Sequence, residues 1–170
     1  MSTKFFTNST GNTLFDKFKG IAADMINFDS FLAVVGFFRS SGYFKLRKEL
    51  GNVSEIKILV GINIDDIFRK HNKALLMLAD EDKAKEIYHN GFKEDIINAQ
   101  YSPEVEEGIL QMCEDLVSGR LQMRIHATKN LHAKFYLCLP QNHSEHSDGW
   151  VIMGSSNISD SGLGIKQPPQ

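Results

Sequence analysis

Two short apolar runs, separated by a stretch of helical character, constrain the fold of this chain most strongly. Residues 31–38 (FLAVVGFF) are continuously apolar, and residues 55–61 (EIKILVG) form a second run. An unbroken run such as residues 31–38 is typical of a strand that is buried on both faces of a sheet, and residues 55–61 are expected to form a second buried strand. Residues 39–42 carry loop and cap chemistry, and a short helix is expected from there through Leu50. The order strand, helix, strand indicates a crossover unit, with residues 31–38 central in the sheet.

Further periodic segments predict helices before, between and after additional strands. Residues 12–28 carry apolar side chains at helical spacing behind a cap at Asn12 or Thr13. Residues 65–118 show no strand pattern and predict two or three helices, the last beginning at Ser102-Pro103 and ending at Gly119. Three more strands are expected, at residues 121–126, 133–139 and 150–153. The fold class is α/β, a mixed sheet flanked by helices, in a single domain spanning residues 1–170.

Composition places the chain among ordinary globular proteins and points to no membrane or secretory segment. Hydrophobic residues make up 42% of the chain and charged residues 24%, which disfavours disorder, collagen and coiled coils. The net charge is −2, so any nucleic-acid contact must come from a local basic cleft. The longest apolar run is too short to span a bilayer. Cys113 and Cys138 lack paired ligand spacing and are interpreted as reduced core thiols, which favours a cytoplasmic location.

Two groups of polar residues near the C-terminus carry the chemistry. His132 stands two residues before Lys134, and after a polar loop the residues 154–157 read Gly-Ser-Ser-Asn. Because residues two apart on a strand point to the same face, His132 and Lys134 are expected to project together. Gly154 permits a sharp turn, and the residues after it offer hydroxyl and amide groups to phosphate oxygens. An imidazole, an ammonium and such donors are what phosphodiester chemistry without a metal requires.

These residues resemble the H-x-K…G-S-x-N signature of the phospholipase D superfamily. The wider context, FLAVVGFFRSSGYFKL, IKILVGI, LHAKFYL and VIMGSSNISDSGLG, is similar to the phospholipase D-like domain at the N-terminus of bacterial Swi/Snf-type helicases. The resemblance covers most of the chain except residues 65–118. It implies a phospholipase D-like fold and a metal-independent phosphodiesterase of nuclease type, without a cofactor, acting on nucleic acid and more specifically DNA.

The resemblance also implies a role for each matched residue. His132 attacks phosphorus and forms a phosphohistidine, while Lys134 and Asn157 complete the catalytic set by stabilising the charge of the transition state. Ser155 and Ser156 are the implied substrate contacts. A second histidine must protonate the leaving oxygen, and because the chain has one motif only, we expect a homodimer that pairs two His132 side chains.

Several features depart from the family pattern. Leu139 stands where the family usually has Asp, and the glutamate that orients the catalytic histidine is absent from the residues after Asn157. Asp160 is a weak substitute, since an Asp in this context is more often a turn residue. No G-x-x-x-x-G-K-[ST] phosphate loop is present, so a helicase motor would belong to missing C-terminal domains of a longer protein from which this domain is excised. The alternative function is a non-catalytic module that binds a phosphate backbone or dimerises its parent.

Other residues admit both a functional and a structural interpretation. Arg39, after the first buried strand, is a candidate substrate contact, although an exposed arginine at a loop is the commoner explanation. His126 is assigned to packing, and His143 and His146 to a solvated loop rather than to a metal site. Trp150 is interpreted as a packing residue and not as a base-stacking platform. The pairs Phe5-Phe6 and Phe37-Phe38 are assigned to the core, and the acidic residues are assigned to a solvated helix face: Glu104, Glu106, Glu107, Glu114 and Asp115.

Overall fold

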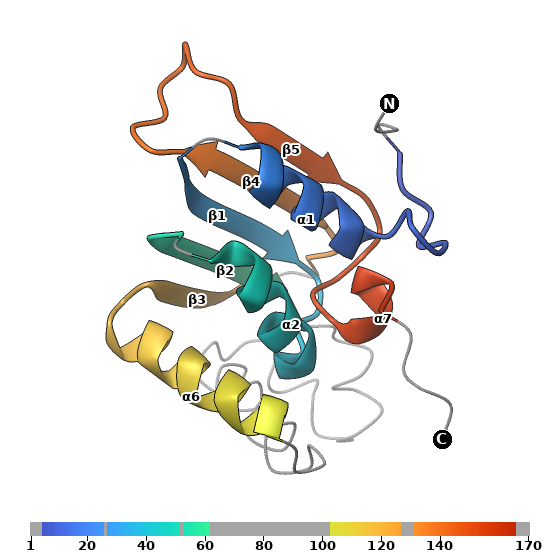
Figure 1. Cartoon of the computed structure of the whole chain (residues 1–170), viewed down its shortest axis with the longest axis vertical. Helices are drawn as coiled ribbons and strands as arrows, with labels where there is room; N and C mark the ends of the chain where they lie inside the picture. The colour runs from blue at the N-terminus through green and yellow to red at the C-terminus, as the bar shows by residue number, and fades with distance from the viewer. Residues whose placement is uncertain (1–4, 26, 52, 62–102, 127–130, 166–170) are drawn as a thin grey trace.

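A five-stranded mixed sheet forms the centre of the protein. The computed structural model describes residues 5–25, 27–51, 53–61, 103–126 and 131–165, and the helices expected between residues 65 and 102 lie outside them. The strands are β1 (Phe28–Val35), β2 (Glu55–Gly61), β3 (Leu121–His126), β4 (Phe135–Pro140) and β5 (Trp150–Met153). Their order is β3-β2-β1-β4-β5, so β1 is central, as predicted. Strands β3, β2 and β1 run parallel, whereas β4 is antiparallel to β1 and to β5 (Figure 1). The α/β class and the mixed sheet are thereby confirmed.

Helices α1 (Leu14–Asp24) and α2 (Ser40–Leu50) lie on one face of this sheet (Figure 1). Helix α1 begins with a capping box, in which Thr13 Oγ1 accepts from the Asp16 backbone N–H and the Asp16 carboxylate accepts from the Thr13 backbone N–H. Two further helices follow, α6 (Pro103–Val117) beside β3 and α2, and the short α7 (Asp160–Leu163), which was not predicted. Among the described residues, none of the helices has the length and apolar character needed to cross a membrane.

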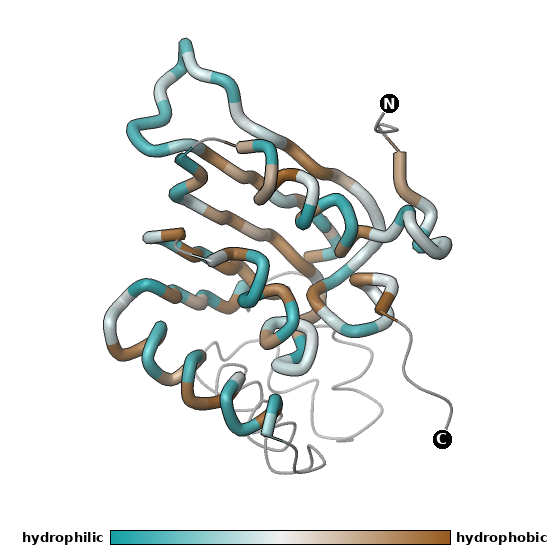
Figure 2. Tube along the Cα trace, viewed as in Figure 1, coloured by the Kyte–Doolittle hydropathy of each residue, from teal (hydrophilic) through white to brown (hydrophobic). Residues whose placement is uncertain are grey.

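The core lies between the sheet and α1 and α2. Side chains on alternate strand positions, among them Phe31, Ile58 and Tyr136, are almost fully buried, and Phe18 of α1 packs edge-on against the rings of Phe31 and Tyr136. The apolar character of the strands is visible along the centre of the sheet in Figure 2.

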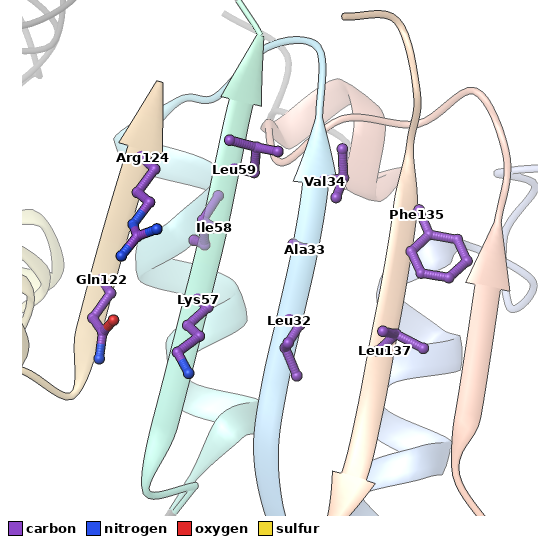
Figure 3. Close-up of a pocket in the computed structure, with 10 residues that line it drawn as sticks. All are labelled: Leu32, Ala33, Val34, Lys57, Ile58, Leu59, Gln122, Arg124, Phe135 and Leu137. Atoms are coloured by element: carbon purple, nitrogen blue, oxygen red, sulfur yellow. The ribbon is translucent and has the colours of Figure 1, made fainter. Parts of the chain in front are cut away.

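The opposite face of the sheet is only half-buried within the part of the chain that the structure describes. It forms a hollow of about 410 Å³, which is lined by Leu32, Val34, Leu137, Lys57 and Arg124. Figure 3 shows this face from the front, with the helices behind the strands. Strand β1 therefore alternates between buried and half-buried positions rather than being equally buried on both faces as expected.

Two assignments on α6 are wrong, although Val105, Ile109 and Met112 of this helix pack toward the core as predicted. A Cβ at Gly108 would lie 2.5 Å from the Phe44 ring, so the missing side chain lets α6 pack closely on α2. This contact turns Cys113 toward solvent, which corrects its assignment to the core; burial of the other thiol, Cys138, raises its pKa to about 12. Asp115 is buried instead of solvated, because Arg47 binds its carboxylate through two nitrogens and Tyr43 donates to it at 3.1 Å.

Two aromatic assignments are also wrong. Trp150 begins the edge strand β5 and is 51% exposed, and Phe5 is 82% exposed because it lies before the first element. Phe6, by contrast, packs against the core, and Phe38 is buried through the bridge that joins it to Ile158.

Candidate functional site

Three strand ends meet at one edge of the sheet, and the candidate residues lie there. Val34, near the end of β1, pairs with Phe135, which pairs in turn with Met153 at the end of β5. The residues just beyond these positions are consequently neighbours. The Gly154 backbone N–H, for example, donates to the Lys134 carbonyl oxygen at 3.2 Å.

His132 and Lys134 lie together, but not for the predicted reason. Strand β4 begins at Phe135, so both residues precede the strand and the alternation of strand side chains does not apply to them. Instead, the Lys134 ammonium turns back along the chain, where it donates to the His132 carbonyl oxygen at 2.7 Å and lies 3.4 Å from His132 Nδ1. The His132 side chain is exposed and Lys134 is half-buried. A phosphate group could therefore reach both.

Asn157 joins this pair at the end of β1. A Cβ at Gly36 would lie 3.3 Å from Lys134 Nζ and 3.6 Å from Asn157 Oδ1, so the two side chains meet over the same glycine. Oδ1 accepts a hydrogen bond from the Phe37 backbone N–H at 3.0 Å. Because the amide oxygen is committed to the backbone, the Nδ2 group is the part of Asn157 that can donate to an oxyanion.

The two serines of the motif lie in different environments. Ser155 is exposed at the turn after β5, next to Gly154. Ser156 is 8% exposed, and Tyr136 Oη donates to its carbonyl oxygen at 2.6 Å while Asn8 Nδ2 lies 3.4 Å from its hydroxyl. Burial raises the Tyr136 pKa, which keeps the phenol protonated as a donor. The geometry thus places Ser155 at the surface of the site and Ser156 in the packing behind it.

Arg39 begins α2 and stacks over a neighbouring aromatic ring. Its guanidinium carbon lies 4.3 Å from the centroid of the Phe37 ring, a cation–π geometry, and its backbone N–H donates to the Ile158 carbonyl oxygen at 2.8 Å. The Phe37 backbone N–H binds Asn157, and the Phe37 ring contacts the Arg39 guanidinium. Phe37 therefore links Arg39 to Asn157.

Asp160, the substitute considered for the orienting glutamate, has another partner. Asp160 Oδ1 accepts from Lys45 Nζ at 2.9 Å, an ion pair that joins α7 to α2. Leu139, near the end of β4, lies against Gly149 at the base of the following loop. Asp160 is therefore engaged as a structural ion-pair partner.

The sequence did not indicate the roles of Gly36, Gly61 and the backbone groups around them. At Gly61 a Cβ would lie 2.5 Å from the Leu131 carbonyl oxygen, so the chain entering β4 crosses the end of β2 as well as that of β1. His126, at the end of β3, pairs with Gly61 and is half-buried. The only available signal was that Gly36 interrupts an otherwise apolar run.

The loop histidines are exposed, and His143 Nδ1 lies 2.9 Å from the Ser147 hydroxyl. Across the described ranges, no three His, Cys, Asp or Glu side chains come together in a way that could hold a metal ion. Neither the known protein-family models nor the curated proteins include a match to this chain.

Proposed function

We propose that this chain is a phospholipase D-like, metal-independent phosphodiesterase domain that cleaves nucleic acid. The observation that carries the proposal is the meeting of Lys134 Nζ and Asn157 Oδ1 over Gly36, with the exposed His132 imidazole beside the lysine. An ammonium and a carboxamide held at one point can stabilise the extra negative charge of a five-coordinate phosphorus.

The proposed reaction has two steps at His132. A ring nitrogen forms a bond to phosphorus as the bond to the leaving oxygen breaks, and an acid protonates that oxygen. Water then attacks phosphorus, breaks the nitrogen–phosphorus bond and regenerates the imidazole, while the water proton passes to a base. Lys134 and Asn157 hold the non-bridging oxygens in both steps, with Ser155 and Arg39 as the proposed substrate contacts. Ser156, which the sequence also predicted as a contact, is 8% exposed and belongs to the packing behind the site.

The proposed assembly is a homodimer in which the second His132 supplies the acid, because the complete H-x-K…G-S-x-N signature occurs once in the chain. Nucleic acid, and DNA in particular, is the proposed substrate, since the sequence is similar to helicase-borne domains. On the same basis we propose a cytoplasmic location and a longer parent protein with helicase domains.

One observation favours the non-catalytic alternative. A lysine ammonium can only donate, so a hydrogen bond across its 3.4 Å contact with Nδ1 requires the neutral tautomer that carries the ring proton on Nε2. An imidazole in this tautomer donates to phosphate through Nε2 but does not attack with it. Catalysis through Nε2 therefore requires that Lys134 leave Nδ1, whereas simple phosphate binding does not.

A cleavage assay in EDTA separates the two functions. The substrates are bis(p-nitrophenyl) phosphate, single- and double-stranded DNA and RNA, and the variants are His132→Ala and Lys134→Ala. Matched controls are His146→Ala in the exposed loop and Lys48→Ala on the exposed side of α2. If the chain is an enzyme, the wild type and both control variants should cleave the substrate in EDTA, and His132→Ala and Lys134→Ala should not. DNA binding without cleavage in the wild-type chain would instead support the binding module.

A further inference from the structure

Gly36 is a glycine that its backbone conformation does not explain. The glycines with positive φ among the described residues are Gly11, Gly51, Gly119 and Gly164, and Gly36 is not one of them. Any residue could adopt its conformation, and a glycine at a strand end costs conformational entropy on folding. The presence of glycine at residue 36 is therefore explained by the atoms that occupy the space where a side chain would lie.

That space contains the groups of the candidate site. A Cβ at Gly36 would meet Leu131 O at 3.1 Å, Lys134 Nζ at 3.3 Å and Asn157 Oδ1 at 3.6 Å. Two of these atoms belong to side chains assigned to the phosphate, and the third belongs to the residue before His132. All three therefore converge on a position that is kept clear by the absence of one side chain.

We propose that Gly36 is a positioning residue of the phosphate pocket, because its missing side chain leaves room for the Lys134 ammonium and the Asn157 amide and so sets where these two groups lie. This inference rests on the proposed function, and it deepens it by naming a residue that aligns the phosphate-binding groups without touching the phosphate. A methyl group at residue 36 displaces the ammonium from its position beside the amide.

The effect on the fold should be small. The contact with Leu131 O requires a shift of only a few tenths of an ångström, and Lys134 Nζ is the far end of a flexible side chain. A displacement of about 1 Å within a catalytic set can cost about 100-fold in rate. The shift of a few tenths of an ångström that the methyl group imposes on Lys134 Nζ should cost less, about three- to tenfold in rate, while Gly36→Ala remains folded.

The matched control is Gly20→Ala. Gly20 lies inside α1, a Cβ there would find nothing within 4 Å, and alanine is the better helix former. The same substitution is therefore made once above the pocket and once away from it. Thermal unfolding should show Gly20→Ala equal to or above the wild type and Gly36→Ala slightly below it.

A double-mutant cycle shows whether Gly36 acts through the lysine. Phosphodiesterase rates and the affinity for inorganic phosphate are measured for Gly36→Ala, Lys134→Ala and the double variant, with the Phe37 amide resonance reporting on Asn157. Gly36→Ala should weaken phosphate binding in the wild-type background and change it less than twofold in the Lys134→Ala background. A purely structural role would produce the same loss in both backgrounds, and this cycle remains readable if the variant is partly destabilised.

The outcomes separate the two proposals. If the wild type cleaves or binds phosphate and Gly36→Ala matches Gly20→Ala within twofold, the role of Gly36 is overturned and the proposed function stands. If the wild type neither cleaves nor binds phosphate, the proposed function fails and the inference fails with it.

Discussion

The Phe37 backbone N–H donates to Asn157 Oδ1 across 3.0 Å, and this bond ties the end of β1 to the loop after β5. The two residues are 120 positions apart in the sequence. The adjacent segments are joined as well, because Phe38 and Ile158 form a parallel bridge. The orientation of the Asn157 amide is thus set by the backbone of a different strand.

Asn157→Asp should separate the structural role of this residue from its phosphate role. The carboxylate keeps an oxygen acceptor for the Phe37 N–H, but it replaces the Nδ2 donor with a negative charge that repels phosphate. We expect a fold close to that of the wild type and the loss of phosphate binding, whereas Asn157→Ala should also lose about 1–3 kcal/mol of stability. Thermal unfolding and phosphate titration measure the two effects. Wild-type affinity for phosphate in Asn157→Asp would contradict the assigned role.

The tautomer of His132 should depend on phosphate. Without phosphate, a hydrogen bond from Lys134 Nζ to Nδ1 requires the ring proton to be on Nε2. Bound phosphate competes for the ammonium, which frees Nδ1 to carry the proton and Nε2 to attack. Ring ¹⁵N chemical shifts at a pH where His132 is neutral report the tautomer directly. If the shifts are the same with and without phosphate, Lys134 does not control the ring.

Loss of the buried carboxylate should destabilise the whole domain. Asp115 is 3% exposed and binds Arg47 and Tyr43 of α2, so Asp115→Ala leaves a buried guanidinium without its charge partner. The expected loss is about 3–5 kcal/mol of the free energy of unfolding. The neighbouring exposed residue offers the control Glu114→Ala, for which urea denaturation should show a change within about 0.5 kcal/mol. Similar values for the two variants would disprove the role of the buried pair.

The cap of α1 should contribute a pH-dependent part of the stability. Hydrogen bonds from the Thr13 backbone N–H and hydroxyl lower the pKa of Asp16 below its usual value near 3.8. Since the folded state favours the carboxylate, this contribution is complete above the unfolded pKa and is lost as the pH falls through the folded pKa. The melting temperature of Asp16→Asn should therefore lie below that of the wild type at pH 6, and the difference should shrink toward pH 3. A difference that stays constant over this range would show that the carboxylate charge is not involved.

Strand positions could be predicted where a turn residue or a polar loop bounds the apolar run. The bounds of β2, β3 and β5 agree with the prediction for this reason. Strand β1 was placed at residues 31–38 but ends at Val35, because the apolar run continues through residues that leave the sheet to meet Ile158. A run of apolar residues does not show where the strand ends, because the residues that follow the strand can be buried as well.

The chemistry of the site could be predicted, but its geometry could not. The spacing of His132 and Lys134 suggested that they are neighbours, yet their proximity results from the lysine folding back on the chain before β4. The contributions of Gly36 and of the Phe37 N–H come from contacts between distant segments, and neither has a local pattern. Asp115 was likewise assigned to solvent because its hydrogen-bond partners, Tyr43 and Arg47, lie on α2, 68 or more positions away.

The central claim is that His132 forms a covalent bond to phosphorus. The most direct test is rapid quenching of the wild-type chain with a phosphodiester substrate in EDTA, followed by intact-mass and peptide mass spectrometry under conditions that preserve phosphohistidine. We expect an acid-labile adduct on His132 that is absent from His132→Ala and accumulates much less in Lys134→Ala. Cleavage of the substrate without any adduct on His132, or with the adduct on another residue, would contradict the account.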